Sequence, residues 1–121
     1  MKLSAARFEE LVAMALDGLP EWVRAHMDNV AVITAFWPTA EQLRAAPAGQ
    51  TLLGLYEGVP LTRRGRGYSL VPPDRITLFQ GPLERLARDE ATLIALIRRT
   101  VVHEIAHHFG FTEGQLRALG Y

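Results

Sequence analysis

The sequence predicts an α+β fold, in which a sheet of three or four strands packs against helices from both ends of the chain. Apolar residues repeat at helical spacing near the N-terminus and again after residue 83, and short β-branched or aromatic runs lie between these regions. The chain has 121 residues, 49% hydrophobic and 21% charged, which is typical of one globular domain with a buried core. We therefore expect residues 1–121 to form a single domain without internal repeats.

The first expected element is a helix that runs from an N-cap at Ser4 to about Asp17. Its apolar residues follow helical spacing, and Leu3 and Phe8 are placed as a hydrophobic staple across the cap. The Gly-Leu-Pro sequence that follows ends this helix and starts a short turn of helix through residues 22–25.

The middle of the chain contains the expected strands. Residues 30–37 are β-branched and aromatic and contain no breaker, so they predict a buried strand. Residues 52–56 predict a second strand, and residues 69–71 a brief one before two prolines. Residues 76–79 predict a further strand that a Gly-Pro pair ends.

Helices are expected between the first two strands and after the last one. Thr39 and Gln42 form a capping-box pattern, which predicts one or two helical turns that Pro47 closes. After the last strand, residues 83–88 and then residues 90–109 predict two helices.

Composition excludes several classes of function. The 13 basic and 13 acidic residues give a formal charge of zero, so we expect no nucleic-acid partner. The chain has no cysteine, so any metal must bind to His, Asp or Glu. Acidic residues interrupt the N-terminal apolar run, and no stretch approaches the roughly 20 apolar residues of a membrane span. These features predict a cytoplasmic protein without a membrane partner, and they leave its oligomeric state open.

The helix expected at residues 90–109 carries a metal-binding pattern. His103 and His107 are four residues apart, which places both imidazoles on one helix face, where they can bind one ion. Glu104 lies about 100° around the helix from His103, so it can reach a water molecule on the ion without being a ligand. The pattern predicts a catalytic zinc site with Glu104 as the general base.

The motif continues to Glu113, so that the full pattern is HExxHxxGxxE. Gly110 stands where a helix ends with a left-handed residue, and the resulting reversal would bring Glu113 back to the ion as a third ligand. The fourth position would then hold water, as in catalytic zinc sites. Glu113 also begins an expected last helix, where Thr112 and Gln115 form a capping box, so a structural role for Glu113 stays open.

Several other polar residues receive mainly structural interpretations. We expect His108 to pack or to support the ligands from outside, and His26 to be structural. Three arginines in the glycine-rich stretch are expected on a solvated loop, with steering of an acidic substrate as the alternative. They are Arg63, Arg64 and Arg66. Any of the three tyrosines could stabilise an oxyanion, and the sequence does not distinguish among them.

The HExxH pattern resembles that of the zincin metallopeptidases, and its spacing is similar to that of the metzincins, which have His or Asp where this chain has Glu113. More narrowly, the chain resembles a family of small bacterial proteins called zincin-like metallopeptidases, or minimal zincins. Residues 53–61, 73–79 and 100–110 carry this resemblance, which together with the N-terminal helix covers most of the chain. The chain also departs from the metzincins in a second respect, because no methionine follows residue 27 to form a methionine turn.

This resemblance implies a small zincin-like fold and zinc-dependent hydrolysis of a peptide or protein substrate. Zinc would lower the pKa of its water and polarise the substrate carbonyl, while Glu104 would take a proton and pass it to the leaving amine. The resemblance also implies that an extended substrate pairs with an edge strand, for which residues 76–79 are the candidate.

Two other functions stay open. A zinc-bearing binding module would recognise a peptide or protein partner without efficient cleavage. A groove beside an open metal position would favour the enzyme, whereas a site blocked by Tyr121 or by residues 63–67 would favour the module. A metal-dependent ribonuclease of the three-histidine type is disfavoured by the neutral charge and by Glu113.

Overall fold

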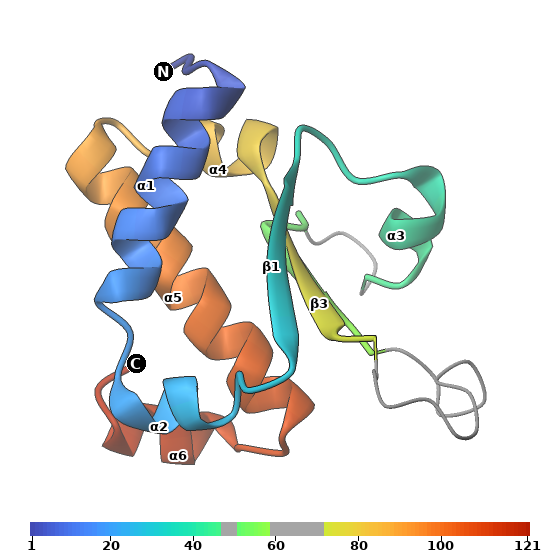
Figure 1. The fold of residues 1–121 in the computed structure, drawn as a ribbon, viewed down its shortest axis with the longest axis vertical. Coiled ribbons are helices and arrows are strands. Elements are labelled where there is room, and N and C mark those ends of the chain that lie inside the picture. Colours follow the sequence, from blue (N-terminus) through green and yellow to red (C-terminus); the bar gives the residue numbers. More distant parts are fainter. Residues whose placement is uncertain (47–50, 59–71) are drawn as a thin grey trace.

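The computed structural model of the protein describes residues 1–46, 51–58 and 72–121 (Figure 1). In these residues, six helices and a three-stranded sheet form an α+β fold, which confirms the predicted fold class. Several sequence predictions lie outside the described residues. They concern the brief strand at residues 69–71, Pro47, Tyr68, and the three arginines Arg63, Arg64 and Arg66.

The elements follow the predicted order along the chain. They are α1 (Ala5–Asp17), α2 (Glu21–Ala25), β1 (Val30–Ala35), α3 (Ala40–Arg44), β2 (Gly54–Glu57), β3 (Asp74–Phe79), α4 (Gln80–Leu86), α5 (Glu90–His108) and α6 (Glu113–Ala118). Three predicted N-caps are confirmed, since the side chains of Ser4, Thr39 and Thr112 each accept a hydrogen bond from a backbone N–H in the first helical turn. The last two form complete capping boxes.

The sheet has the strand order β1-β3-β2, so β3 is its central strand. β1 pairs with β3 in parallel, and β2 pairs with β3 antiparallel. The prediction that residues 76–79 form an exposed edge is therefore wrong. Those residues are buried on β3 and pair on both sides, whereas β2 contacts α5 and lies at the edge of the sheet that the described residues form.

β1 is the opposite edge of the sheet, and this position corrects a second prediction. Residues 30–37 were expected to form a buried strand, but the strand ends at Ala35 and is only partly buried. Ile33 keeps 42% of its surface exposed, and Phe36 and Trp37 beyond the strand keep 52% and 47%. A β-branched run indicates a strand, but neighbouring strands decide how deeply it is buried.

α4 begins earlier than predicted. The Gly-Pro pair was expected to end β3 before a helix at residues 83–88, but the helix starts at Gln80 and includes both residues. Pro82 fits in the first helical turn because its missing N–H would have no partner there. A Cβ at Gly81 would lie 2.7 Å from the Trp37 ring, so a larger residue here would displace that ring.

The hydrophobic core lies between the sheet and the helices α1 and α5, which run side by side on one side of the sheet (Figure 1). Most of the largest fully buried side chains come from α1, β3 and α5. They include Phe8, Leu11, Ile76, Leu78, Phe79, Ile97 and Ile105. Among the described residues, no helix combines the length and apolar character that crossing a bilayer requires.

Candidate metal centre

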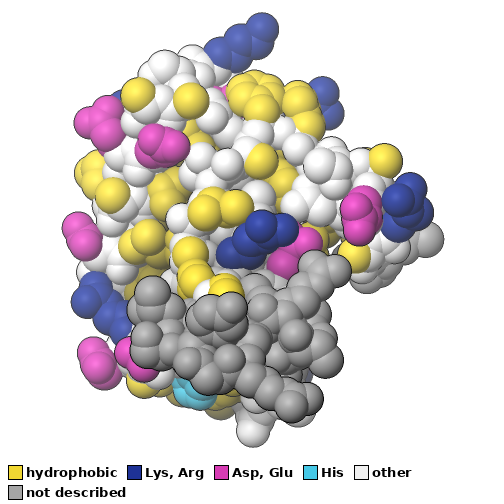
Figure 2. Space-filling view, turned by 45° about the vertical axis from the view of Figure 1, so that its right-hand side comes forward, with side chains coloured by type: hydrophobic (Ala, Val, Ile, Leu, Met, Phe, Trp, Pro, Cys, Tyr) yellow, Lys and Arg dark blue, Asp and Glu magenta, His cyan; other side chains and the backbone are white. Residues whose placement is uncertain are grey.

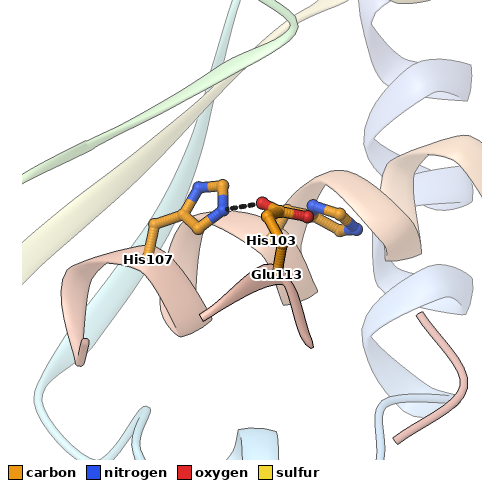
Figure 3. A group of neighbouring side chains, drawn as sticks. All are labelled: His103, His107 and Glu113. Carbon is orange, nitrogen blue, oxygen red and sulfur yellow. Dashed lines mark hydrogen bonds and ion pairs between the residues drawn. The ribbon is translucent and has the colours of Figure 1, made fainter. Parts of the chain in front are cut away.

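The last turns of α5 and the first turn of α6 bring three potential ligands together. His103 and His107 lie on α5, and Glu113 is the first residue of α6. One ligand atom from each residue lies within 4.8 Å of the other two, and His107 Nε2 is 2.7 Å from Glu113 Oε1 (Figure 3). This group of two imidazoles and one carboxylate could hold a metal ion.

The chain reverses between the two helices through a glycine turn. Gly110 has a φ of +84°, in the left-handed region that glycine adopts at little cost. The N–H of Phe111 donates to the carbonyl of Ala106 at 2.8 Å, which closes the end of α5. The capping box at Thr112 then starts α6, so Glu113 returns to the level of His107.

His103 is partly buried, and its Nε2 atom is buried without a hydrogen-bond partner in the described part of the chain. Burial lowers the pKa of His103, and the positive charge of Arg99 lowers it further. Both causes favour the neutral imidazole, which is the form that binds metals. An unsatisfied buried nitrogen costs about 1 to 3 kcal/mol, so a ligand at this atom would remove an unfavourable feature.

Glu104 is also partly buried, beside the edge strand β2. The backbone N–H of Tyr56 donates to Glu104 Oε1 at 2.9 Å. Burial raises the pKa of Glu104, while the Tyr56 hydrogen bond opposes this rise. The result is a carboxylate in a fixed orientation with increased basicity.

The hydrogen bonds of β2 show which of its backbone groups are turned away from β3. The carbonyl of Leu53 accepts from the N–H of Phe79, and Leu55 lies opposite Thr77. Since antiparallel pairing alternates, the backbone groups of Gly54 and Tyr56 point away from β3. Gly54 also allows β2 to approach α5 closely, because a Cβ there would lie 2.7 Å from Thr100 Cγ2.

A cleft of about 660 Å³ lies between β2 and the helix face that carries the histidines. Both histidines and Glu104 line this cleft. The remaining lining residues come from the end of α3, from the segment at β2 and from the preceding turns of α5: Ala45, Ala46, Thr51, Leu52, Leu53, Gly54, Leu55, Leu96, Arg99 and Thr100. The two histidines therefore border a space that can admit another molecule.

The two described tyrosines have other contacts. Tyr56 donates its hydroxyl to Asp74 Oδ2 at 2.7 Å, and its ring stacks on His108 at a centroid distance of 3.8 Å. Tyr121 packs against Trp22, with ring centroids 6.3 Å apart. Neither tyrosine lines the cleft.

The structural interpretation of His26 agrees with its contacts. Its Nδ1 lies 2.8 Å from the carbonyl oxygen of Trp22, and its ring lies beside Phe109.

The sequence interpretation did not single out Arg99 or the Tyr56 N–H. The position of Arg99, four residues before His103, was a usable signal, because residues four apart share a helix face. The Tyr56 contact had no such signal, because it joins distant parts of the chain.

The chain has a small α+β fold in which an HExxH helix lies beside an edge strand. These two features together are typical of the zincin class of proteins. The family model described as zincin-like metallopeptidase matches residues 27–121, and the chain belongs to this family. The resemblance inferred from the sequence motifs is thereby confirmed.

The fold is also similar to a solved structure. That structure is a conserved hypothetical protein from T. thermophilus, which is 22% identical, has a TM-score of 0.53, and is matched over 88% of this chain and 94% of that chain. At this identity the likeness concerns the fold alone. No curated protein matches the chain.

Proposed function

We propose that the protein is a zinc-dependent peptidase in which His103, His107 and Glu113 hold the metal and Glu104 is the general base. The observation that carries this proposal is the shared cleft. It joins the two histidines and Glu104 to the edge strand β2. Membership of the zincin-like metallopeptidase family supports hydrolysis of a peptide bond as the reaction.

The three proposed ligands fit zinc in their chemistry. Two imidazole nitrogens and one carboxylate oxygen form a donor set used in catalytic zinc sites, and such sites keep a further position for water. The unpartnered, buried Nε2 of His103 supports this fit, as far as the described residues show. When bound, zinc would supply Lewis-acid polarisation of the substrate carbonyl and a lower pKa of the attacking water.

Glu104 is suited to move the proton of that water. Its raised pKa brings its basicity closer to that required of a base at neutral pH. The Tyr56 N–H engages Oε1, and a carboxylate has a second oxygen that can accept a proton while this hydrogen bond persists. Glu104 would then deliver the proton to the leaving amine.

β2 is the strand that we propose for binding an extended substrate. It replaces the predicted candidate at residues 76–79, which lie on the central strand. The outward-pointing backbone of Gly54 lies on the cleft wall, where it can pair with a peptide by strand addition. The substrate would thus lie between β2 and the proposed metal ligands.

The binding-module alternative receives less support from the same geometry. A site blocked by Tyr121 or by residues 63–67 would favour a module; Tyr121 packs on Trp22, and residues 63–67 lie outside the described residues. The cleft beside the proposed ligands favours an enzyme. Among the described residues that Figure 2 shows, acidic and basic side chains are scattered among one another.

Two substitutions distinguish the role of the general base from that of the metal ligands. Glu104→Gln should bind zinc at the parent stoichiometry and lose about 100-fold to 10,000-fold in peptide hydrolysis, because only the proton acceptor is removed. His107→Ala should lose both zinc and hydrolysis. Elemental analysis measures the metal, and cleavage of a peptide library followed by mass spectrometry measures the activity.

Two results would contradict the proposal in different ways. If Glu104→Gln cleaves as fast as the parent, Glu104 is not the base. If the parent binds zinc and cleaves no peptide, the protein is a zinc-bearing binding module.

A further inference from the structure

Arg99 lies in the cleft, one helical turn before the first proposed metal ligand. Because Arg99 and His103 are four residues apart on α5, they share one face of the helix. Both line the cleft, together with Leu96 in the turn before them. The guanidinium is thus beside the path of any substrate that reaches the metal centre from that end.

Arg99 has no ion-pair partner among residues 1–46, 51–58 and 72–121. Several other arginines in this part of the chain are engaged, although Arg44 and Arg117 also lack an ion-pair partner among the described residues. Arg7 pairs with Glu90 at 2.7 Å, and the neighbouring Arg98 donates to the carbonyl of Ala15 at 3.1 Å. Arg99 differs from them in presenting its charge to the cleft.

The surroundings of Arg99 favour an anion. Six of the thirteen lining residues are Ala or Leu, and Glu104 is the one acidic side chain among the described residues that line the cleft. Glu104 is held by the Tyr56 N–H and points to the β2 side. Arg99 itself is exposed to solvent, and its planar guanidinium can bind a carboxylate through two charge-assisted hydrogen bonds.

We infer that Arg99 determines specificity by binding a carboxylate of the substrate. This inference rests on the proposed function, because it assumes that the cleft holds a peptide. One helical turn is about 5.4 Å and an extended peptide rises about 3.3 Å per residue, so the carboxylate lies within about two residues of the scissile bond. It belongs either to an Asp or Glu side chain or to a free C-terminus.

The test separates binding from cleavage. A zinc-loaded Glu104→Gln protein is immobilised and offered a random hexapeptide library in two forms, one with free and one with amidated C-termini. Retained peptides are identified by mass spectrometry. The same selection is made with Arg99→Gln, Arg99→Lys and Arg88→Gln, each in the Glu104→Gln background. Arg88 is a matched control because its side chain is 87% exposed and lies outside the cleft.

We expect peptides with a carboxylate to be enriched about tenfold to a hundredfold over their neutral counterparts, as a charge-assisted hydrogen bond predicts. Arg99→Gln abolishes the enrichment, Arg99→Lys restores part of it, and Arg88→Gln leaves it unchanged. Enrichment in the amidated library assigns the carboxylate to a side chain. Enrichment confined to the free-acid library assigns it to the C-terminus.

Three results would overturn the inference: enrichment of neutral peptides, no enrichment, or enrichment that survives Arg99→Gln. This holds whether or not the parent protein cleaves peptides. The proposed function fails separately, if parent protein with its zinc does not cleave the peptides that the Glu104→Gln protein selects.

Discussion

His103 and Glu104 are adjacent in the sequence, yet the same physical cause shifts their pKa values in opposite directions. Burial lowers the pKa of His103 and raises that of Glu104, because it disfavours the charged form of each group. The neutral imidazole is the form that binds metal, and the more basic carboxylate is the better proton acceptor. Both shifts therefore agree with the roles proposed for these residues.

Gly110 offers a test of how the glycine turn positions Glu113. No atom lies within 4 Å of a Cβ built at this position, so Gly110→Ala carries only the cost of a positive φ, about 1 to 2 kcal/mol. We expect this loss of stability together with weaker zinc binding, because alanine would strain the turn that returns Glu113 to His107.

Gly120→Ala is the matched control for Gly110→Ala. Gly120 also has a positive φ, of +91°, and open space around its Cβ position, but it follows α6. The Gly120→Ala variant should lose a similar free energy of unfolding, measured by chemical denaturation. It should keep the zinc affinity of the parent, measured by calorimetric titration. Equal zinc affinity in both variants would show that the turn does not position Glu113.

At the scale of elements, α5 connects the core to the proposed site. One face of this helix is buried along its length, with residues at the spacing of a helical stripe. They are Leu93, Ile97, Val101, Val102, Ile105 and Ala106. Because this stripe fixes the rotation of the helix, Arg99, His103 and His107 are turned toward the cleft.

The start of α5 should make stability depend on pH. Hydrogen bonds from Thr92 lower the pKa of Asp89, first the one from its side chain and then the one from its N–H, which donates to Asp89 Oδ1 at 2.7 Å. Since the folded-state pKa is depressed, the stabilisation is present above the ordinary carboxyl pKa of about 4 and is lost as the pH falls through the lower value.

Asp89→Asn tests this dependence, because asparagine caps a helix without titrating. We expect a Tm close to that of the parent at pH 7 and a smaller fall in Tm between pH 5 and pH 2, measured by circular dichroism. Asp28→Asn removes the same charge from an exposed turn and should keep the parent profile. A parent-like profile for Asp89→Asn would assign the acid sensitivity elsewhere.

At the scale of the whole molecule, the core extends beyond the part that matches the family model. The match covers residues 27–121, but α1 contributes Phe8, Leu11, Val12 and Ala15 to the core against α5. Arg7 adds two hydrogen bonds to Glu90 on α5. The helix that carries the histidines is thus supported by residues that the family model does not match.

A fragment of residues 27–121 should therefore lose cooperative folding. Removing α1 exposes the apolar stripe of α5. Each large side chain that is removed from the core lowers the free energy of unfolding by about 1.5 to 3 kcal/mol. Thermal unfolding followed by circular dichroism measures the cooperativity. As a milder comparison, Leu11→Ala in the full chain should unfold cooperatively with about 2 to 5 kcal/mol less stability. A fragment with the parent Tm would show that α1 is dispensable.

The sequence by itself determined those features that depend on near neighbours in the chain. Helix caps at Ser4, Thr39 and Thr112 were predictable because a cap involves residues three apart. The grouping of His103 with His107 followed from one helical turn, and the glycine reversal predicted that Glu113 would approach them.

Only the tertiary structure decided the features that depend on residues far apart in the chain. It made β3 the central strand and β2 the edge beside α5, and strand order is set by the packing of the whole sheet. It also formed the hydrogen bond from the Tyr56 N–H to Glu104 and made Arg99 part of the cleft lining. Local spacing carries no information on such contacts, because their energies depend on burial and on partners that only the folded chain brings together.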